Sequence, residues 1–109
     1  MSLLVVIKER TKKVEARRQE AIIEARRLAL LLREKFTFQS LYLVGSILSS
    51  KFRLHSDIDM VIEGLKQEYF FKAHALLLKE SAFDIDLKPF EDLSDDYQKK
   101  VLSGGLKIG

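Results

Sequence analysis

Hydrophobic residues recur along the chain with two spacings, and each spacing predicts a type of element. Between about residues 8 and 35 most residues are strong helix formers, and the apolar positions follow one another at helical steps. These positions are Val14, Ala21, Ala25, Leu28 and Leu32. The pattern predicts one long amphipathic helix over residues 8–35.

Three short apolar runs are of strand length. Leu41–Val44 and Ile58–Ile62 are each followed by a residue pair that favours a turn. Phe83–Leu87 alternates instead, so that Asp84 and Asp86 share the face opposite its apolar residues. We therefore predict three strands, the third with an acidic face.

Two further segments return to helical character, residues 66–81 and residues 90–102. Pro89 separates the third strand from the last helix, because proline cannot donate to a ladder, and Gly104-Gly105 ends that helix. The order of elements predicts an α/β (α+β) fold with a small mixed sheet covered by helices. We expect a single domain over residues 1–109, with the helix at 8–35 leading into a core at about 40–109.

The composition is that of an ordinary globular protein, with 47% hydrophobic and 32% charged residues in 109. The chain has no cysteine, so a bound metal would need oxygen ligands or the two histidines, His55 and His74. The apolar run Leu3–Ile7 is too short for a signal peptide or a membrane span. We therefore expect a cytoplasmic protein that does not enter a membrane.

The net charge of +3 is unevenly distributed. Residues 8–35 contain ten Lys and Arg against five Glu. This excess is consistent with a solvent-exposed helix face that has no further role. It is also consistent with a contact surface for RNA or for an acidic partner protein. The pattern leaves both open.

The candidate chemistry lies around the first two strands. Asp57 and Asp59 are two apart in an extended segment, which places two carboxylates on one face about 7 Å apart at Cα. Such a pair repels unless a cation lies between, and Mg²⁺ favours oxygen ligands of this kind. Gly45-Ser46, after the preceding strand, can bring backbone N–H groups and a hydroxyl close to an anion.

The segment GSILSSKFRLHSDIDM, residues 45–60, resembles the signature of the DNA polymerase beta-like nucleotidyltransferases, in which Gly-Ser is followed about ten residues later by Asp-x-Asp. The resemblance is to the small members called minimal nucleotidyltransferases, or MNT proteins, and covers roughly residues 41–108. It implies the nucleotidyltransferase fold.

The resemblance also implies roles for individual residues. Gly45 and Ser46 would hold the terminal phosphates of ATP or another nucleoside triphosphate, and Asp57, Asp59 and Asp86 would be catalytic and would bind the metal, two Mg²⁺ ions in such enzymes. Asp84, on the same strand face as Asp86, is the alternative third carboxylate.

The function implied is transfer of a nucleoside monophosphate, most simply AMP, to a hydroxyl of a partner protein. Proteins of this kind are usually the antitoxin beside a HEPN ribonuclease toxin, so we expect a HEPN-type partner and a homo- or hetero-oligomer. Two alternatives remain: a catalytically weak module that silences the toxin by covering it, and an RNA-binding protein that uses the basic first helix.

The chain departs from the family pattern after the Gly-Ser. Where an arginine is common, it has Ile47-Leu48-Ser49-Ser50. Positive charge near the triphosphate would then come from Lys51, Arg53 or a partner, and we expect weak nucleotide affinity.

Overall fold

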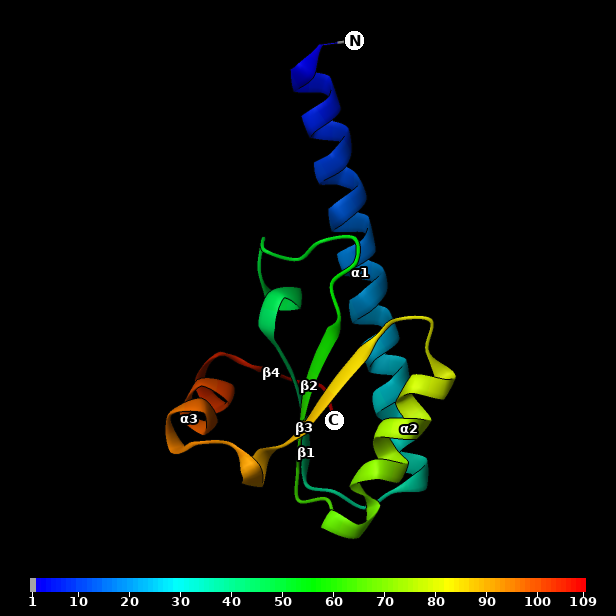
Figure 1. The fold of residues 1–109 in the computed structure, drawn as a ribbon, viewed down its shortest axis with the longest axis vertical. Coiled ribbons are helices and arrows are strands. Elements are labelled where there is room, and N and C mark those ends of the chain that lie inside the picture. Colours follow the sequence, from blue (N-terminus) through cyan, green and yellow to red (C-terminus); the bar gives the residue numbers. More distant parts are fainter. Residues whose placement is uncertain (1) are drawn as a thin grey trace.

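The computed structural model of the chain describes residues 2–109, so Met1, the first residue of the predicted domain, lies outside the described residues. Figure 1 shows the arrangement of its helices and strands. The helices are α1 (Leu3–Lys35), α2 (Phe70–Glu80) and α3 (Asp95–Gly104), and the strands are β1 (Ser40–Val44), β2 (Ile58–Glu63), β3 (Ile85–Pro89) and β4 (Leu106–Lys107). Three short 3₁₀ turns complete the order: η1 (Gly45–Leu48), η2 (Gln67–Tyr69) and η3 (Phe90–Asp92).

The four strands form one mixed sheet in the order β3-β2-β1-β4. β1 pairs antiparallel with both β2 and β4, whereas β2 pairs parallel with β3. A parallel pair needs a crossover connection, which α2 provides. Pro89 ends β3 at the edge of the sheet, where its missing N–H costs little. The predicted small mixed sheet covered by helices is confirmed.

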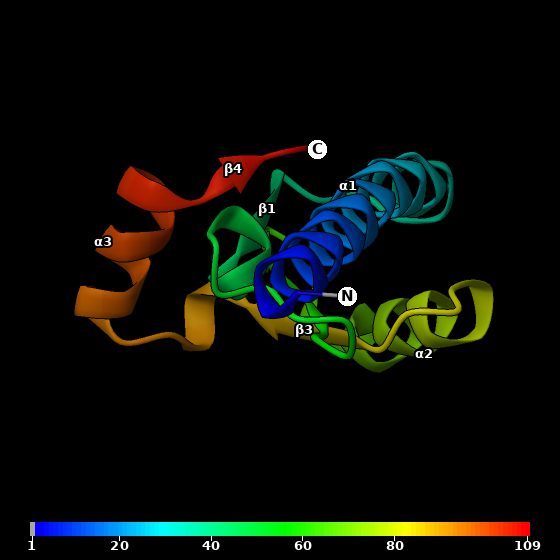
Figure 2. The same ribbon diagram turned by 90° about the horizontal axis from the view of Figure 1, so that it is seen from above.

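The two faces of the sheet differ in what covers them. One face is apolar and packs on α1 and α2. Its main contributors are Leu41, Leu43, Met60, Ile62 and Leu87 from the strands, with Ala25, Leu28, Leu32, Ala73 and Leu77 from the helices. The other face has a smaller cluster beneath α3, formed by Val44, Val61, Phe90 and Val101. Figure 2 shows α1 and α2 together on one side and α3 on the other.

The long first helix is confirmed, although it begins at Leu3 rather than near Lys8. The Ser2 hydroxyl accepts a hydrogen bond from the Val5 N–H at 3.3 Å and so caps the apolar run, which contains no residue that would break a helix. All the buried residues of α1 lie between Ala21 and Leu32, and its N-terminal half projects from the body of the protein (Figure 1). None of the helices in residues 2–109 has the length and apolar character needed to cross a membrane.

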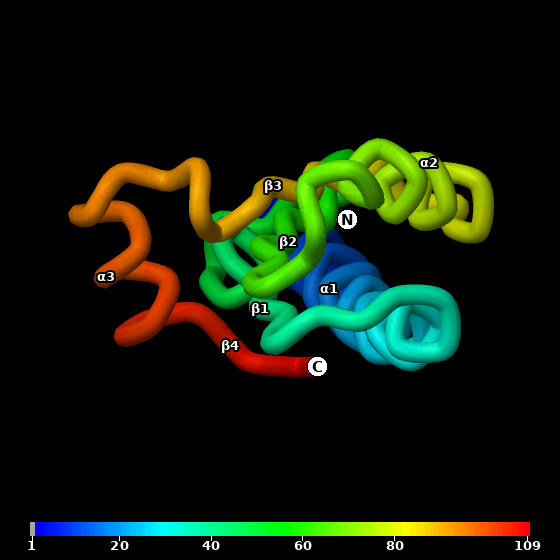
Figure 3. The backbone as a smooth tube through the Cα atoms, turned by 90° about the horizontal axis from the view of Figure 1, so that it is seen from below, coloured from blue at the N-terminus to red at the C-terminus, as the bar shows by residue number. Residues whose placement is uncertain are grey.

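The chain end holds an element that the sequence pattern does not reveal. β4 is only two residues long, too short to show an alternation, and pairs with Tyr42 and Leu43 of β1. The segment continues past β4, where the Ile108 N–H donates to the Leu41 carbonyl at 2.8 Å. Figure 3 shows the chain returning from α3 through β4 to the C-terminus beside α1.

The other boundaries shift for local reasons. The third strand begins at Ile85 rather than Phe83. The last helix, predicted over 90–102, is a 3₁₀ turn followed by α3, because Ser94 starts a new helix by accepting a hydrogen bond from the Tyr97 N–H at 3.2 Å. The helix predicted over 66–81 begins as η2 and becomes α2 at Phe70.

Candidate active site

The parallel pairing of β2 and β3 brings two carboxylates together. Asp59 and Asp86 are direct partners in this ladder and therefore project from the same face of the sheet, the face that α3 covers only in part. Burial raises the pKa of the Asp59 carboxyl, and the negative charges of Asp86 and Asp57 raise it further. Negative charge is thus concentrated at this point of the open face.

Asp57 lies immediately before β2 and is exposed. The preceding turn is closed at Ser56, whose hydroxyl accepts a hydrogen bond from the Arg53 N–H at 2.8 Å and whose N–H donates to the Arg53 carbonyl at 3.1 Å. The serine of the Ser-Asp-Ile-Asp segment therefore fixes the turn from which Asp57 extends.

The Gly-Ser turn closes directly against Asp59. Val44, the last residue of β1, is the ladder partner of Asp59, and Gly45 follows with φ of 77°. A Cβ atom at Gly45 would lie 2.5 Å from the Asp59 Oδ2 atom, so any side chain there would push the Asp59 carboxylate aside, and the positive φ would strain it as well. The two halves of the sequence motif therefore meet at a point that favours glycine.

Ser46 is half-buried in η1, beside Gly45. Its carbonyl accepts a hydrogen bond from the Ser49 N–H at 2.9 Å, which holds the turn. Its hydroxyl has no hydrogen-bond partner within residues 2–109, so it is free to contact a ligand.

The structure distinguishes the two candidates for the third carboxylate. Asp86 is in register with Asp59, whereas Asp84 precedes β3, is exposed, and is not among the groups that shift the Asp59 pKa. The Asp84 backbone carbonyl accepts a hydrogen bond from the Ile58 N–H at 2.9 Å and so helps start the ladder. The geometry favours Asp86.

Lys88 lies on the same strand face as the carboxylate pair. Lys88 forms an ion pair with Asp86, and the hydrogen bond to Asp86 raises the Lys88 pKa, with smaller contributions from Asp59 and Tyr97. The alternation of β3 placed Lys88 on this face, but its pairing depends on the rotamer and could not be read from the sequence.

In residues 2–109 no three acidic or histidine side chains are gathered closely enough to form a ready metal site.

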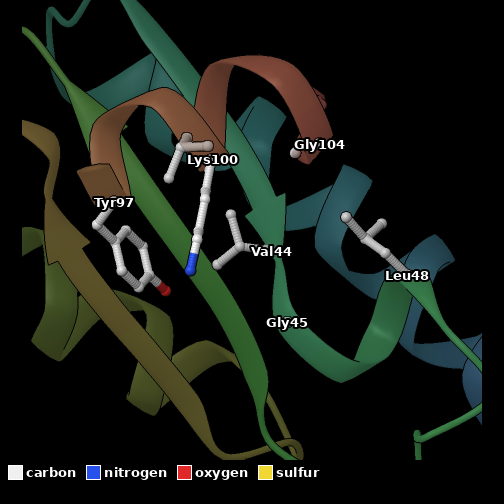
Figure 4. Close-up of a pocket in the computed structure, with 8 residues that line it drawn as sticks. Val44, Gly45, Leu48, Tyr97, Lys100 and Gly104 are labelled. Carbon is white, nitrogen blue, oxygen red and sulfur yellow. The ribbon is translucent and has the colours of Figure 1, made fainter. Parts of the chain in front are cut away.

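A cavity of about 300 Å³ lies beside the Gly-Ser turn (Figure 4). It is lined by Val44, Gly45, Leu48, Tyr97, Lys100, Val101, Gly104 and Gly105. Figure 4 shows the Lys100 ammonium and the Tyr97 hydroxyl reaching into this space from α3. Sequence reasoning missed both residues, because nothing in the pattern of the last helix shows which of its faces meets β1.

Lys51 and Arg53, which we predicted to supply positive charge in place of the missing arginine, do not line the cavity beside the Gly-Ser turn. Arg53 donates through Nη1 to the carbonyls of Ser50 and Phe52, each at 3.1 Å, and lines a separate cavity of about 390 Å³ against α1. Lys51 is exposed in the same connection. Lys88 is instead the cation paired with the Asp86 carboxylate, and Lys100 lines the cavity beside the Gly-Ser turn.

Two contacts hold the Gly-Ser turn and the following connection in place. Arg18 of α1 donates through Nε to the carbonyl of Ile47, in η1, at 2.6 Å. Phe52 is fully buried in the main core and anchors the connection between the turn and Asp57. Neither role is visible in the sequence, because both depend on where α1 crosses the sheet.

The two histidines lie on α2 and in the connection before β2. His74 is half-buried on α2, and its Nε2 atom is 2.8 Å from the carbonyl of Ile85, which ties α2 to β3. His55 is exposed in the connection before Asp57. His74 therefore has a structural role.

Comparisons with known proteins agree with this architecture. The sequence matches the nucleotidyltransferase domain over residues 25–108. Similar solved structures include a toxin–antitoxin with AMP-PNP, with a TM-score of 0.65 and 23% identity, covering 79% of this chain and 72% of that chain. Another is the toxin–antitoxin MntA–HepT, with a TM-score of 0.61 and 21% identity, covering 80% of this chain and 70% of the other. No curated protein matches the chain significantly.

Proposed function

Because the chain belongs to the nucleotidyltransferase domain family, we propose that it transfers a nucleoside monophosphate from a nucleoside triphosphate to a hydroxyl of a partner protein. AMP from ATP is the simplest donor chemistry, in keeping with the AMP-PNP in a structural neighbour of the same fold. The observation that carries the proposal is the placement of Asp59 and Asp86 side by side, with Gly45 against Asp59.

The site residues divide the work by position. Gly45 and Ser46 would receive the β- and γ-phosphates, because η1 presents a free hydroxyl and a glycine beside the carboxylates. The acceptor hydroxyl oxygen would then bond to the α-phosphorus while the bond from that phosphorus to the bridging oxygen breaks, which releases pyrophosphate. The hydroxyl proton would pass to the Asp86 carboxylate.

The carboxylates are also ligands of the type that a divalent cation such as Mg²⁺ prefers. Asp57, Asp59 and Asp86 would be the ligands of Mg²⁺, because they offer only oxygen donors, and burial together with the negative charges of Asp86 and Asp57 already raises the Asp59 pKa. When bound, Mg²⁺ supplies charge neutralisation for the phosphates. Lys88 would have to leave Asp86 or share it with the cation, since it is the present partner of that carboxylate.

The partner would be a HEPN-type ribonuclease toxin, which makes this chain the antitoxin of the pair. The support is the shared fold with the MntA–HepT structures. Asp59 and Asp86 are only partly buried on the acidic face of the sheet, which would leave them accessible to a protein hydroxyl. Assembly as a homo- or hetero-oligomer, a single domain over 1–109 and a cytoplasmic location remain predictions.

A catalytically weak module that silences the toxin by covering it is the second candidate. Two observations favour it: Asp86 is already paired with Lys88, and exposed apolar side chains cluster on the projecting end of α1. These side chains are Leu3, Leu4, Val5 and Ile7. An RNA-binding role for the basic part of α1 has no support beyond charge.

The deciding experiment incubates the protein with α-phosphate-labelled ATP, Mg²⁺ and its co-expressed toxin, and compares wild type with Asp59→Asn. Transfer predicts a labelled toxin band with wild type and a loss of at least about a hundredfold for the variant, because a carboxylate beside the reacting phosphate is removed. Asp84→Asn is the matched control, since it removes a neighbouring exposed carboxylate, and we expect it to retain labelling.

The same variants separate the two candidates in cells. Transfer requires that Asp59→Asn, shown to be folded by circular dichroism, no longer neutralises the toxin. Neutralisation that survives this substitution, with no labelling by wild type from any of the four nucleotides, would establish the covering module instead.

A further inference from the structure

We propose that Lys100 of α3 binds the phosphates of the nucleoside triphosphate and so replaces the arginine that the Gly-Ser turn of this chain lacks. This inference rests on the proposed function. It assigns the cavity beside Gly45 as part of the nucleotide site, with the Lys100 ammonium on its α3 wall.

The cavity lies where such a contact is needed. Gly45, which lines it, is also the residue that closes against Asp59, so the cavity and the carboxylate pair are linked through Gly45. η1 contributes a second wall through Leu48. A triphosphate held by the Gly-Ser turn would therefore extend along this cavity rather than across the apolar core.

The fold fixes α3 in the orientation that directs Lys100 inward. Val101 is buried against Val44 and Val61 of the sheet, which sets the rotation of the helix about its axis. Tyr97 lies about one helical turn before Lys100 and therefore faces the same side. Figure 4 shows both polar ends converging on the space beside Val44.

Lys100 is the cation that remains available there. Lys88 is paired with Asp86, and the Arg53 guanidinium is bonded to the carbonyls of its own connection. The ammonium of Lys100 has no ion-pair partner among residues 2–109, not even Asp96 one turn earlier. An unpaired ammonium in a concave site is suited to a phosphate oxygen.

The size and walls of the cavity also fit part of a nucleotide. Its volume of about 300 Å³ is at the lower end of the range for ligand pockets. Apolar walls from Val44, Leu48 and Val101 surround few polar groups, which is the usual composition of a site that positions one charged ligand. The cavity wall is open at Gly104, where a Cβ atom would have no neighbour within 4 Å.

The test measures binding of a fluorescent ATP analogue, with unlabelled ATP and adenosine as competitors, to Lys100→Gln and to Lys99→Gln. Lys99 is the matched control, because it is an exposed lysine directly before Lys100 in α3 and does not line the cavity. We expect Lys100→Gln to weaken ATP binding about tenfold and Lys99→Gln to change it by less than about twofold. Lys100→Arg should restore most of the affinity, and adenosine competition should be the same in all variants.

The outcomes separate this inference from the proposed function. Equal losses of ATP affinity in the Lys99 and Lys100 variants, or a normal affinity in Lys100→Gln, would overturn the role of Lys100 while leaving nucleotide transfer intact. A wild-type protein that binds no nucleoside triphosphate would overturn both. Glutamine is as good a helix former as lysine, so these exposed substitutions leave α3 folded.

Discussion

At the scale of single residues, the contact between Gly45 and Asp59 is the most demanding in the site. The positive φ of Gly45 disfavours any side chain, and a Cβ atom there would also displace the Asp59 carboxylate. The glycine therefore does two things at once: it turns the chain after β1, and it leaves room for a carboxylate at the start of the phosphate-binding turn.

Gly45→Ala should therefore impair both stability and transfer. We expect a loss of at least about 1–2 kcal/mol in the free energy of unfolding from the left-handed backbone alone, and a displaced Asp59 carboxylate that lowers labelling of the partner. Urea denaturation and the labelling assay measure the two effects. Gly104→Ala is the control for stability, because its Cβ meets nothing, and an equal loss there would contradict this account.

At the scale of elements, α1 supports the Gly-Ser turn from the apolar face of the sheet, opposite to the face that α3 covers. Arg18 reaches the Ile47 carbonyl of η1 from α1, 29 residues earlier in the chain, and Glu15 holds the same guanidinium through Nη1 at 3.0 Å. The first helix thus fixes the turn on which phosphate binding depends.

Loss of this tie should loosen the turn. For Arg18→Ala we expect faster hydrogen–deuterium exchange in residues 45–48 and weaker ATP binding, because the Ile47 carbonyl loses a charged donor. Arg26→Ala removes the same charge from an exposed position of α1 that has no ion pair or side-chain hydrogen bond within residues 2–109. The exchange rates of residues 45–48 should not change in that control, and unchanged rates in Arg18→Ala would refute the tie.

At the scale of the whole molecule, α1 is clasped to the end of α2 by a small polar network. Glu24 accepts hydrogen bonds from Arg27 Nε at 2.6 Å and from the Ser81 hydroxyl at 2.7 Å, and Arg27 Nη2 also donates to the Glu80 carbonyl at 2.8 Å. The hydrogen bond from Arg27 lowers the pKa of Glu24, and the one from Ser81 lowers it further. The clasp thus depends on an ionised Glu24.

This clasp should make part of the stability dependent on pH. The folded-state pKa of Glu24 lies below its ordinary value of 4.5, so its contribution is complete above that pH and is lost as the pH falls through the lowered pKa. Glu24→Gln should therefore cost up to about 1 kcal/mol at pH 7, a small amount because the partner arginine is half-exposed, and less at pH 3. Urea midpoints at the two pH values measure the difference.

Glu34→Gln provides the comparison for this pH dependence. Glu34 is an exposed glutamate of α1 without an ion pair or side-chain hydrogen bond in residues 2–109. We expect its substitution to leave the urea midpoint nearly unchanged at both pH values. The same pH dependence in both variants would mean that the clasp contributes nothing specific.

Much of the fold could be predicted because its elements have strong local patterns. The helical spacing of Ala21, Ala25, Leu28 and Leu32 identified the buried side of α1, and each of these residues is fully buried. The first strands were placed to within one residue at each end. β4 was missed because two residues carry no periodicity, and the start of α1 was placed too late because its cap, Ser2, lies before an apolar run without polar alternation.

The sequence by itself determined the three helices, the first three strands, the family and the pairing of a Gly-Ser turn with Asp57 and Asp59, because these depend on spacing along one segment. Only the tertiary structure decided which third carboxylate stands beside Asp59, because Asp84 and Asp86 share a strand face and the β2–β3 register alone selects between them. It also decided which cations act near the site, since the pairing of Lys88 with Asp86 depends on the side-chain rotamer and Lys100 reaches the Gly-Ser turn from α3, a contact that no local pattern encodes.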